Sequence, residues 1–173
     1  MADVQRYVKW SKNTIITPVQ SGVTVEIGDL MFLDKIDDLR NDGSSTANNC
    51  AYPLEYLRIS GASLELNKRQ VKSYFLGVAL NSKGGIGDIT ETTNIPIATA
   101  GVFNFDMKPA KTVYIGEYVA PSGTTSGSDM YNQKVMKSTE VLDAIGFFAE
   151  RKSYARTADV VLKTTFGRLG SIT

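Results

Sequence analysis

The sequence contains no histidine and only one cysteine, Cys50, among its 173 residues. Without histidine, neither a Ser-His-Asp triad nor a Cys-His pair can form. A lone cysteine excludes a thiolate cluster and an internal disulfide, which is typical of a protein made in a reducing compartment. With no activating base available, Cys50 is expected to be a small apolar filler. The composition therefore predicts no enzyme, no cofactor and no metal site.

Long hydrophobic runs and a strong net charge are also missing. No window of about 18 apolar residues exists, so no membrane-spanning helix is predicted. The opening segment MADVQRYVKWSKN lacks the apolar centre of a signal peptide. Lysine and arginine number 19 against 18 acidic residues, and a net charge of +1 gives no general attraction to nucleic acid or anionic membranes. Neither is expected as a partner.

Two functional classes stay open as alternatives after these exclusions. A carboxylate-only glycosidase needs two acids facing a sugar cleft, but Asp29 and Glu117 recur in the same short phrase and are expected to form turns. A nucleic-acid-binding barrel needs basic residues interleaved with aromatic ones, whereas Tyr74 and Phe75 have only Lys72 beside them. Salt-sensitive DNA binding would support the second class, and glycan turnover would support the first.

A repeated phrase is the most informative feature that is present. TVEIGDLMFL (24–33) reappears as TVYIGEYVAP (112–121). Two further phrases recur in the same order: FLGVALNSK (75–83) with AIGFFAERK (144–152), and NIPIATAGVF (94–103) with DVVLKTTFGR (159–168). Glycine turns flanked by valine are common in β proteins, so composition alone offers a second explanation. The conserved order favours two copies of one β unit.

The periodicity predicts a mainly β protein with one helix, built from small barrel or sandwich units. Each unit is expected to consist of short alternating strands joined by glycine turns. The predicted organisation is an N-terminal arm at 1–13, a first β unit at 14–107, and a second β unit at 108–173. The first unit is expected to carry a loop insertion at 34–51, which would explain its greater length, and a helix at about 63–74.

Three polar stretches are candidates for partner contacts. The arm carries Tyr7, Val8 and Trp10, bulky residues with little reason to lie on a free tail, although a frayed terminus is the simpler alternative. The loop motif DLRNDG superficially resembles a calcium loop, but Arg40 stands where a ligand should be, so Asp38 and Arg40 are expected to be solvated or to contact a partner. Residues 150–168 hold five basic and two acidic residues, which indicates a solvated face or a weak contact with an acidic partner.

The order of the phrases resembles a known family. NTIITPVQSGVTVEIGDLMFL, YFLGVALNS, IPIATAGVFNF, TVYIGEYVAP and DAIGFFAER follow one another as the corresponding segments do in the small capsid decoration, or cement, proteins of tailed bacteriophages. The similarity covers roughly Thr14 to Arg168. The insertion and the long arm depart from the family pattern, so contacts made through them are not carried over.

The resemblance implies a virion structural protein without enzymatic activity. It implies binding to the outer surface of an icosahedral head, with the major capsid protein as partner, and a homotrimer around three-fold positions. The expected location is the virion surface, with the host cytoplasm before assembly. Another virion component, such as a head-fibre base or a tail protein, is the alternative.

Overall fold

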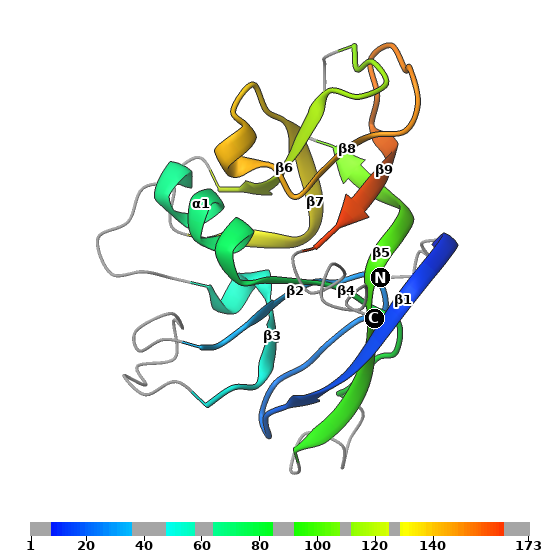
Figure 1. The fold of residues 1–173 in the computed structure, drawn as a ribbon. Coiled ribbons are helices and arrows are strands. Elements are labelled where there is room, and N and C mark those ends of the chain that lie inside the picture. Colours follow the sequence, from blue (N-terminus) through cyan, green and yellow to red (C-terminus); the bar gives the residue numbers. More distant parts are fainter. Residues whose placement is uncertain are drawn as a thin grey trace, which may run out of the picture.

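The computed structural model describes residues 8–35, 48–57, 64–84, 92–107, 112–124 and 129–164. The protein is mainly β, a five-stranded barrel with additional strands and one short helix, which confirms the predicted fold class (Figure 1). Two predicted contact residues of the loop, Asp38 and Arg40, lie outside the described residues, as does Tyr7 of the arm.

The barrel is formed by the C-terminal half of the chain. Its strands are β5 (Thr93–Met107), β6 (Tyr118–Gly123), β7 (Met130–Lys137), β8 (Gly146–Phe148) and β9 (Thr157–Lys163). They pair in the order β5-β7-β6-β8-β9, and β9 pairs with β5 again, which closes the ring. The β5–β7 pair is parallel and the other four are antiparallel. Inward-facing side chains such as Phe105, Phe148 and Val160 are fully buried and fill the interior.

The N-terminal half forms a related sheet on the other half of β5. It contains β1 (Val8–Val19), β2 (Leu30–Leu33), β3 (Ala51–Pro53) and β4 (Phe75–Ala79). β3 pairs with β2, β2 with β4, and both β4 and β1 pair with β5. β1 and β3 lie in contact, and Asn48 donates a 2.7 Å hydrogen bond to the Gln20 side chain between them.

The repeated phrases occupy equivalent turns. Val25 bridges Lys83, and Val113 bridges Lys152 in the same way. The Gly28 amide donates to the carbonyl of Ala79 at 2.9 Å, and the Gly116 amide donates to that of Phe148 at 3.0 Å. Both glycines have positive φ, +95° and +84°, which a glycine adopts without strain. The backbone hydrogen bonding of the two phrases is therefore the same, and their common origin by duplication stays a prediction.

The equivalence extends to β1 and the second half of β5. Ile15 lies opposite Ile97, and Phe103 lies opposite Val160. The shift from Ile15 to Phe103 equals the shift from Gly28 to Gly116, 88 positions, so the two segments correspond without a gap. The first half of β5 is therefore the last strand of the first unit, and its second half is the first strand of the second unit. The predicted boundary between the units, after Met107, lies at the end of β5. The correspondence of β1 with the second half of β5 instead favours a boundary near Gly101.

The helix explains most of the extra length of the first unit. Leu33 pairs with Ala51, and Pro121 pairs with Val135, so the loop after the repeated phrase is only four residues longer in the first unit. The stretch from Ala51 to Gly77 in the first unit is fifteen residues longer than the corresponding stretch from Val135 to Gly146 in the second. It contains η1 (Leu54–Tyr56) and α1 (Leu64–Tyr74). The expectation that the 34–51 loop accounts for the difference is wrong, because most of the addition folds as this helical segment.

α1 lies between the two units, in contact with β2 on one side and with β6 and η3 (Val141–Asp143) on the other (Figure 1). Its bounds agree with the predicted helix. Val71 is fully buried and Leu64 is half-buried, whereas Leu66 on the flank is exposed. The helix therefore packs one apolar side between the units.

The predicted arm is in large part a strand. β1 begins at Val8, and Trp10 pairs with Val102 of β5. The expectation that the strand pattern begins at Thr14 is wrong. Apolar and polar residues do not alternate regularly in this segment, but the main-chain hydrogen bonds of a strand do not require that alternation. Irregularities in the register between Val8 and Thr14 accommodate the irregular sequence.

Candidate interaction surface

The described residues contain little that resembles a catalytic or metal centre. They include no group of three or more acidic, histidine or cysteine side chains able to hold a metal ion. Among the helices described, none has the length and apolar character needed to cross a membrane. Cys50 is buried, as its apolar role requires.

The two acidic residues of the repeated phrase hold the turns. The Asp29 carboxylate accepts a 2.8 Å hydrogen bond from the Glu26 amide, and the Glu117 carboxylate accepts one of 3.0 Å from the Tyr114 amide. Each carboxylate thus satisfies a main-chain donor three residues earlier. This geometry assigns both residues a turn-forming role, as expected from the sequence.

Their surroundings differ, and so do their pKa values. Asp29 is buried, and burial raises its pKa from 3.8 to about 6, although hydrogen bonds from Glu26 and Gln133 oppose this shift. Glu117 is more exposed, and the hydrogen bond from Lys137 at 2.6 Å lowers its pKa. Gln133 belongs to β7 and donates to Asp29 at 2.9 Å, so Asp29 also connects the two units.

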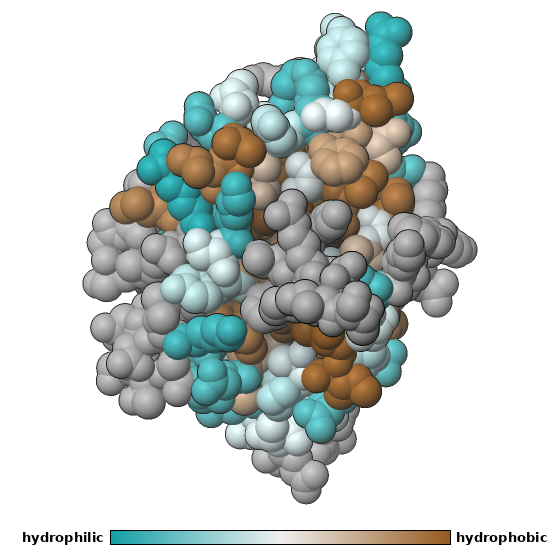
Figure 2. Space-filling view, in the orientation of Figure 1, coloured by the Kyte–Doolittle hydropathy of each residue, from teal (hydrophilic) through white to brown (hydrophobic). Residues whose placement is uncertain are grey.

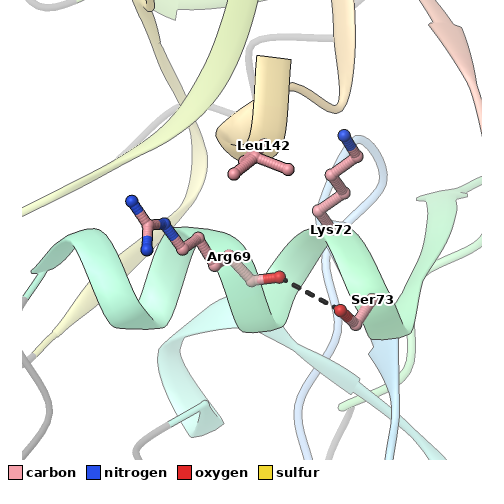
Figure 3. Close-up of a pocket in the computed structure, with 4 residues that line it drawn as sticks. All are labelled: Arg69, Lys72, Ser73 and Leu142. Carbon is pink, nitrogen blue, oxygen red and sulfur yellow. Dashed lines mark hydrogen bonds between the residues drawn. The ribbon is translucent and has the colours of Figure 1, made fainter. Parts of the chain in front are cut away.

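An open pocket lies where α1 meets η3. Arg69, Lys72 and Ser73 of the helix and Leu142 line it, with Arg69 and Lys72 reaching past Leu142 from the same helix (Figure 3). The Arg69 Nε lies 3.7 Å from a carboxylate oxygen of buried Asp143, and the Lys72 ammonium donates to the Val141 carbonyl. Because its charged groups already hold α1 against η3, we assign this pocket a structural role.

The outer surface of the barrel carries an apolar row. Tyr118 of β6 lies opposite Phe147 of β8, Phe147 lies opposite Val161 of β9, and Val161 lies opposite Val102 of β5. Directly opposed residues share a face of the sheet. Tyr118 and Phe147 are each 41% exposed, and the two valines are partly exposed. These four residues are called the outer face below. Figure 2 shows apolar surface over the region of β8 and β9.

The turn before Tyr118 extends this surface with further apolar groups. Ile115 is 71% exposed and Tyr114 is 47% exposed. The Arg151 guanidinium lies 5.4 Å from the centre of the Tyr114 ring, within the range of a cation–π contact. Aromatic and basic groups therefore lie side by side at this end of the barrel.

The residues predicted from sequence to bind a partner are only partly placed. Val8 and Trp10 lie in β1, where Trp10 pairs with Val102 of β5. Sequence reasoning missed Tyr118 and Phe147. A signal was present, because the second copy of the repeated phrase has tyrosine where the first has Glu26 and Leu30.

Comparisons with known proteins give similarity to solved structures only. No family model matches the chain, and no curated protein matches it. Among solved structures, the N base of the head fiber gp8.5 of bacteriophage phi29 is similar, with a TM-score of 0.43 and 9% sequence identity. The similarity covers 87% of this chain and 95% of that chain.

Proposed function

We propose that this protein is a virion structural protein, a decoration or cement protein that binds the outer surface of a phage head and stabilises contacts between major capsid subunits. The observation that carries the proposal is the exposed outer face on a closed β barrel. A rigid sheet that presents adjoining apolar residues to solvent is suited to binding another protein. The order of the sequence phrases, which resembles that of the cement proteins, supplies the kind of partner.

The finer parts of the proposal follow from the same resemblance. The partners are the major capsid protein and two further copies of this chain in a homotrimer, with no cofactor, enzymatic activity, membrane or direct nucleic-acid contact. The protein is placed on the capsid surface, and in the host cytoplasm before assembly. Tyr7, Val8 and Trp10 near the N-terminus and Asp38 and Arg40 in the loop are proposed as additional contacts on their own chemistry, because bulky side chains near a terminus and a polar loop are suited to contacting a partner. Many symmetric sites would combine modest contacts into firm attachment.

A head-fibre base is the alternative within the same class, and the phi29 chain named above carries that description. The two functions differ in what the virion loses without the protein. Heads lacking a cement protein should be less resistant to heat and to internal pressure. Heads lacking a fibre base should keep their stability and lose the attached fibre.

The proposal is tested by adding the purified chain to heads assembled without it. We expect saturable binding, a copy number set by the symmetry sites of the head, and DNA release at a higher temperature. Light scattering should give a particle three times the 18.8 kDa chain mass. Absence of saturable binding would overturn the proposed function, and a monomer on the head would overturn the trimer. Binding without any gain in head stability would favour the fibre base.

A further inference from the structure

We propose that the outer face of the second unit, Tyr118, Phe147, Val161 and Val102, is the docking site for a capsid segment that is apolar at its centre and carboxylate-bearing at its edge. The inference rests on the proposed function for the identity of the partner as a head protein. The chemistry of the contact comes from the comparison of the two units and from the charges around the face.

Three of the four equivalent positions of the first unit are buried, whereas Thr14, which corresponds to Val102, is exposed. Leu30 corresponds to Tyr118 and is 0% exposed, Val78 corresponds to Phe147 and is 1% exposed, and Ala98 corresponds to Val161 and is 0% exposed. All residues of β2 and β4 are buried, so this sheet is covered on both faces. α1 and η1, which lie outside the sheet, contact β2 and contribute to this cover.

The second unit lacks the segment that covers the first. The chain passes from η3 at Val141–Asp143 to β8 at Gly146 almost directly, whereas η1 and β4 are separated by α1. Within the described part of the chain, no helix lies between η3 and β8. The positions of Leu30 and Val78 are therefore covered by the chain itself in the first unit. The equivalent positions in the second unit, Tyr118 and Phe147, are uncovered and carry aromatic side chains.

The loop between β8 and β9 carries another exposed aromatic residue, Tyr154, whose backbone conformation is strained. Tyr154 has a φ of +50° and is 79% exposed. A bulky residue in the left-handed region is strained, and such strain is retained mainly where a function requires it. The loop is held by the bridge between Lys152 and Val113, so the Tyr154 ring is presented from a braced position next to the turn at Tyr114.

The charges around the face indicate an acidic partner. Glu117 pairs with Lys137, Glu150 lies 3.7 Å from Lys152, and buried Asp159 accepts a hydrogen bond from Asn104. No ion pair joins Arg151 or Arg156 to a carboxylate among the described residues, and both arginines are exposed. An acidic group on the partner would supply these two exposed arginines with a counter-ion. Charge complementarity thus favours an acidic edge on the partner.

The test uses heads assembled without this protein and the full-length chain carrying Tyr118→Thr and Phe147→Thr. Threonine keeps the strand preference and removes the aromatic groups. We expect affinity for heads to fall at least about tenfold, as for substitution of residues that dominate an interface. The matched control is Ile16→Thr, which removes a 74%-exposed apolar side chain from β1 of the first unit and should leave affinity unchanged.

A second pair of variants tests the acidic edge. Arg151→Glu with Arg156→Glu should weaken head binding and reverse its dependence on salt, because attraction becomes repulsion. Arg151→Lys with Arg156→Lys retains the charge and should restore most of the affinity. Unchanged unfolding transitions of all variants establish that the fold is intact.

The outcomes separate the two proposals. If the wild-type chain fails to bind heads, the proposed function fails and the capsid docking fails with it. If the wild type binds and the double threonine variant binds equally well, only the docking site is overturned. If that variant changes the oligomeric mass in solution while its affinity for heads is unchanged, the face binds a second copy, which overturns the partner assigned here. Binding that the glutamate variants leave unaltered overturns the acidic edge.

Discussion

At the scale of single residues, equivalent positions in the two units have different environments. Asp29 and Glu117 make the same main-chain hydrogen bond, yet burial raises the pKa of Asp29 while the contact with Lys137 lowers that of Glu117. Local geometry is a property of the short phrase. The electrostatics depend on what the rest of the chain places beside it.

We predict that Asp29→Asn stabilises the protein at neutral pH and loses this advantage as the pH falls. The folded-state pKa of Asp29, about 6, lies above the usual aspartate pKa of 3.8. The charged form is therefore disfavoured by folding, and the resulting cost is full above pH 6, shrinks as pH falls through 6, and is absent below about 4. The gain should approach at most about 3 kcal/mol at pH 7.5.

Urea unfolding at pH 4 and pH 7.5 measures this difference. The matched control is Glu117→Gln in the equivalent turn. Since the pKa of Glu117 is lowered, its carboxylate stabilises the fold at neutral pH, and this contribution is lost as pH falls. The control should therefore have the opposite sign. An equal effect of Asp29→Asn at both pH values would contradict the prediction.

We predict that Gly77→Ala and Gly146→Ala each lower the free energy of unfolding by about 3 kcal/mol or more. The added methyl group would overpack against backbone atoms that cannot move away. A Cβ on Gly77 would lie 2.0 Å from the Ala98 carbonyl oxygen, and one on Gly146 would lie 2.2 Å from that of Val161. Gly116→Ala is the comparison, since its Cβ would meet nothing within 4 Å and only the positive φ is strained, a cost of about 1 kcal/mol. Thermal unfolding that ranks Gly116→Ala as the most damaging of the three would refute this account.

At the scale of elements, β1 and α1 show how the two units differ. β1 pairs along the first half of β5 and beyond it to Phe103, and α1 fills the space between the units. α1 is an addition to the N-terminal unit, whereas β1 corresponds to the second half of β5. The C-terminal unit instead closes its barrel through the parallel pair of β5 and β7.

We predict that deleting residues 1–13 destabilises the protein, in contrast to the sequence-based expectation that this segment is an arm outside the first β unit. The deletion removes Val8–Asn13, which pair with β5 from Phe103 to Ala100. Deleting residues 1–7 retains all of β1 and is the control. A lower unfolding temperature is expected for the longer deletion alone, and equal unfolding temperatures for the two deletions would show that this part of β1 contributes nothing.

At the scale of the whole molecule, the shared strand β5 joins the units into one sheet. Phe103, Phe105 and Met107 in its second half are buried, as are Ile95 and Ile97 in its first half. A single strand therefore supplies core residues to both units. Domain boundaries drawn at the end of this strand cut through the hydrophobic core of the barrel.

We predict that a fragment of residues 100–173 folds and that a fragment of residues 108–173 does not. The shorter fragment lacks the half of β5 that pairs with β7 and β9, so its barrel cannot close. Circular dichroism and thermal unfolding distinguish the two outcomes. A cooperative transition for both fragments would contradict the position of the boundary near Gly101.

The sequence by itself determined the class of fold, the helix, and the position and chemistry of the two turns, because these depend on neighbours within a few residues. In both copies of the phrase the acidic residue, Asp29 or Glu117, accepts a hydrogen bond from the amide three residues earlier. The tertiary structure alone decided that β1 begins at Val8, that β5 serves both units, and that Leu30 is buried whereas Tyr118 is exposed. These outcomes depend on pairing and cover by segments far away in the chain, and apolar periodicity does not encode which of two equivalent faces another element will cover.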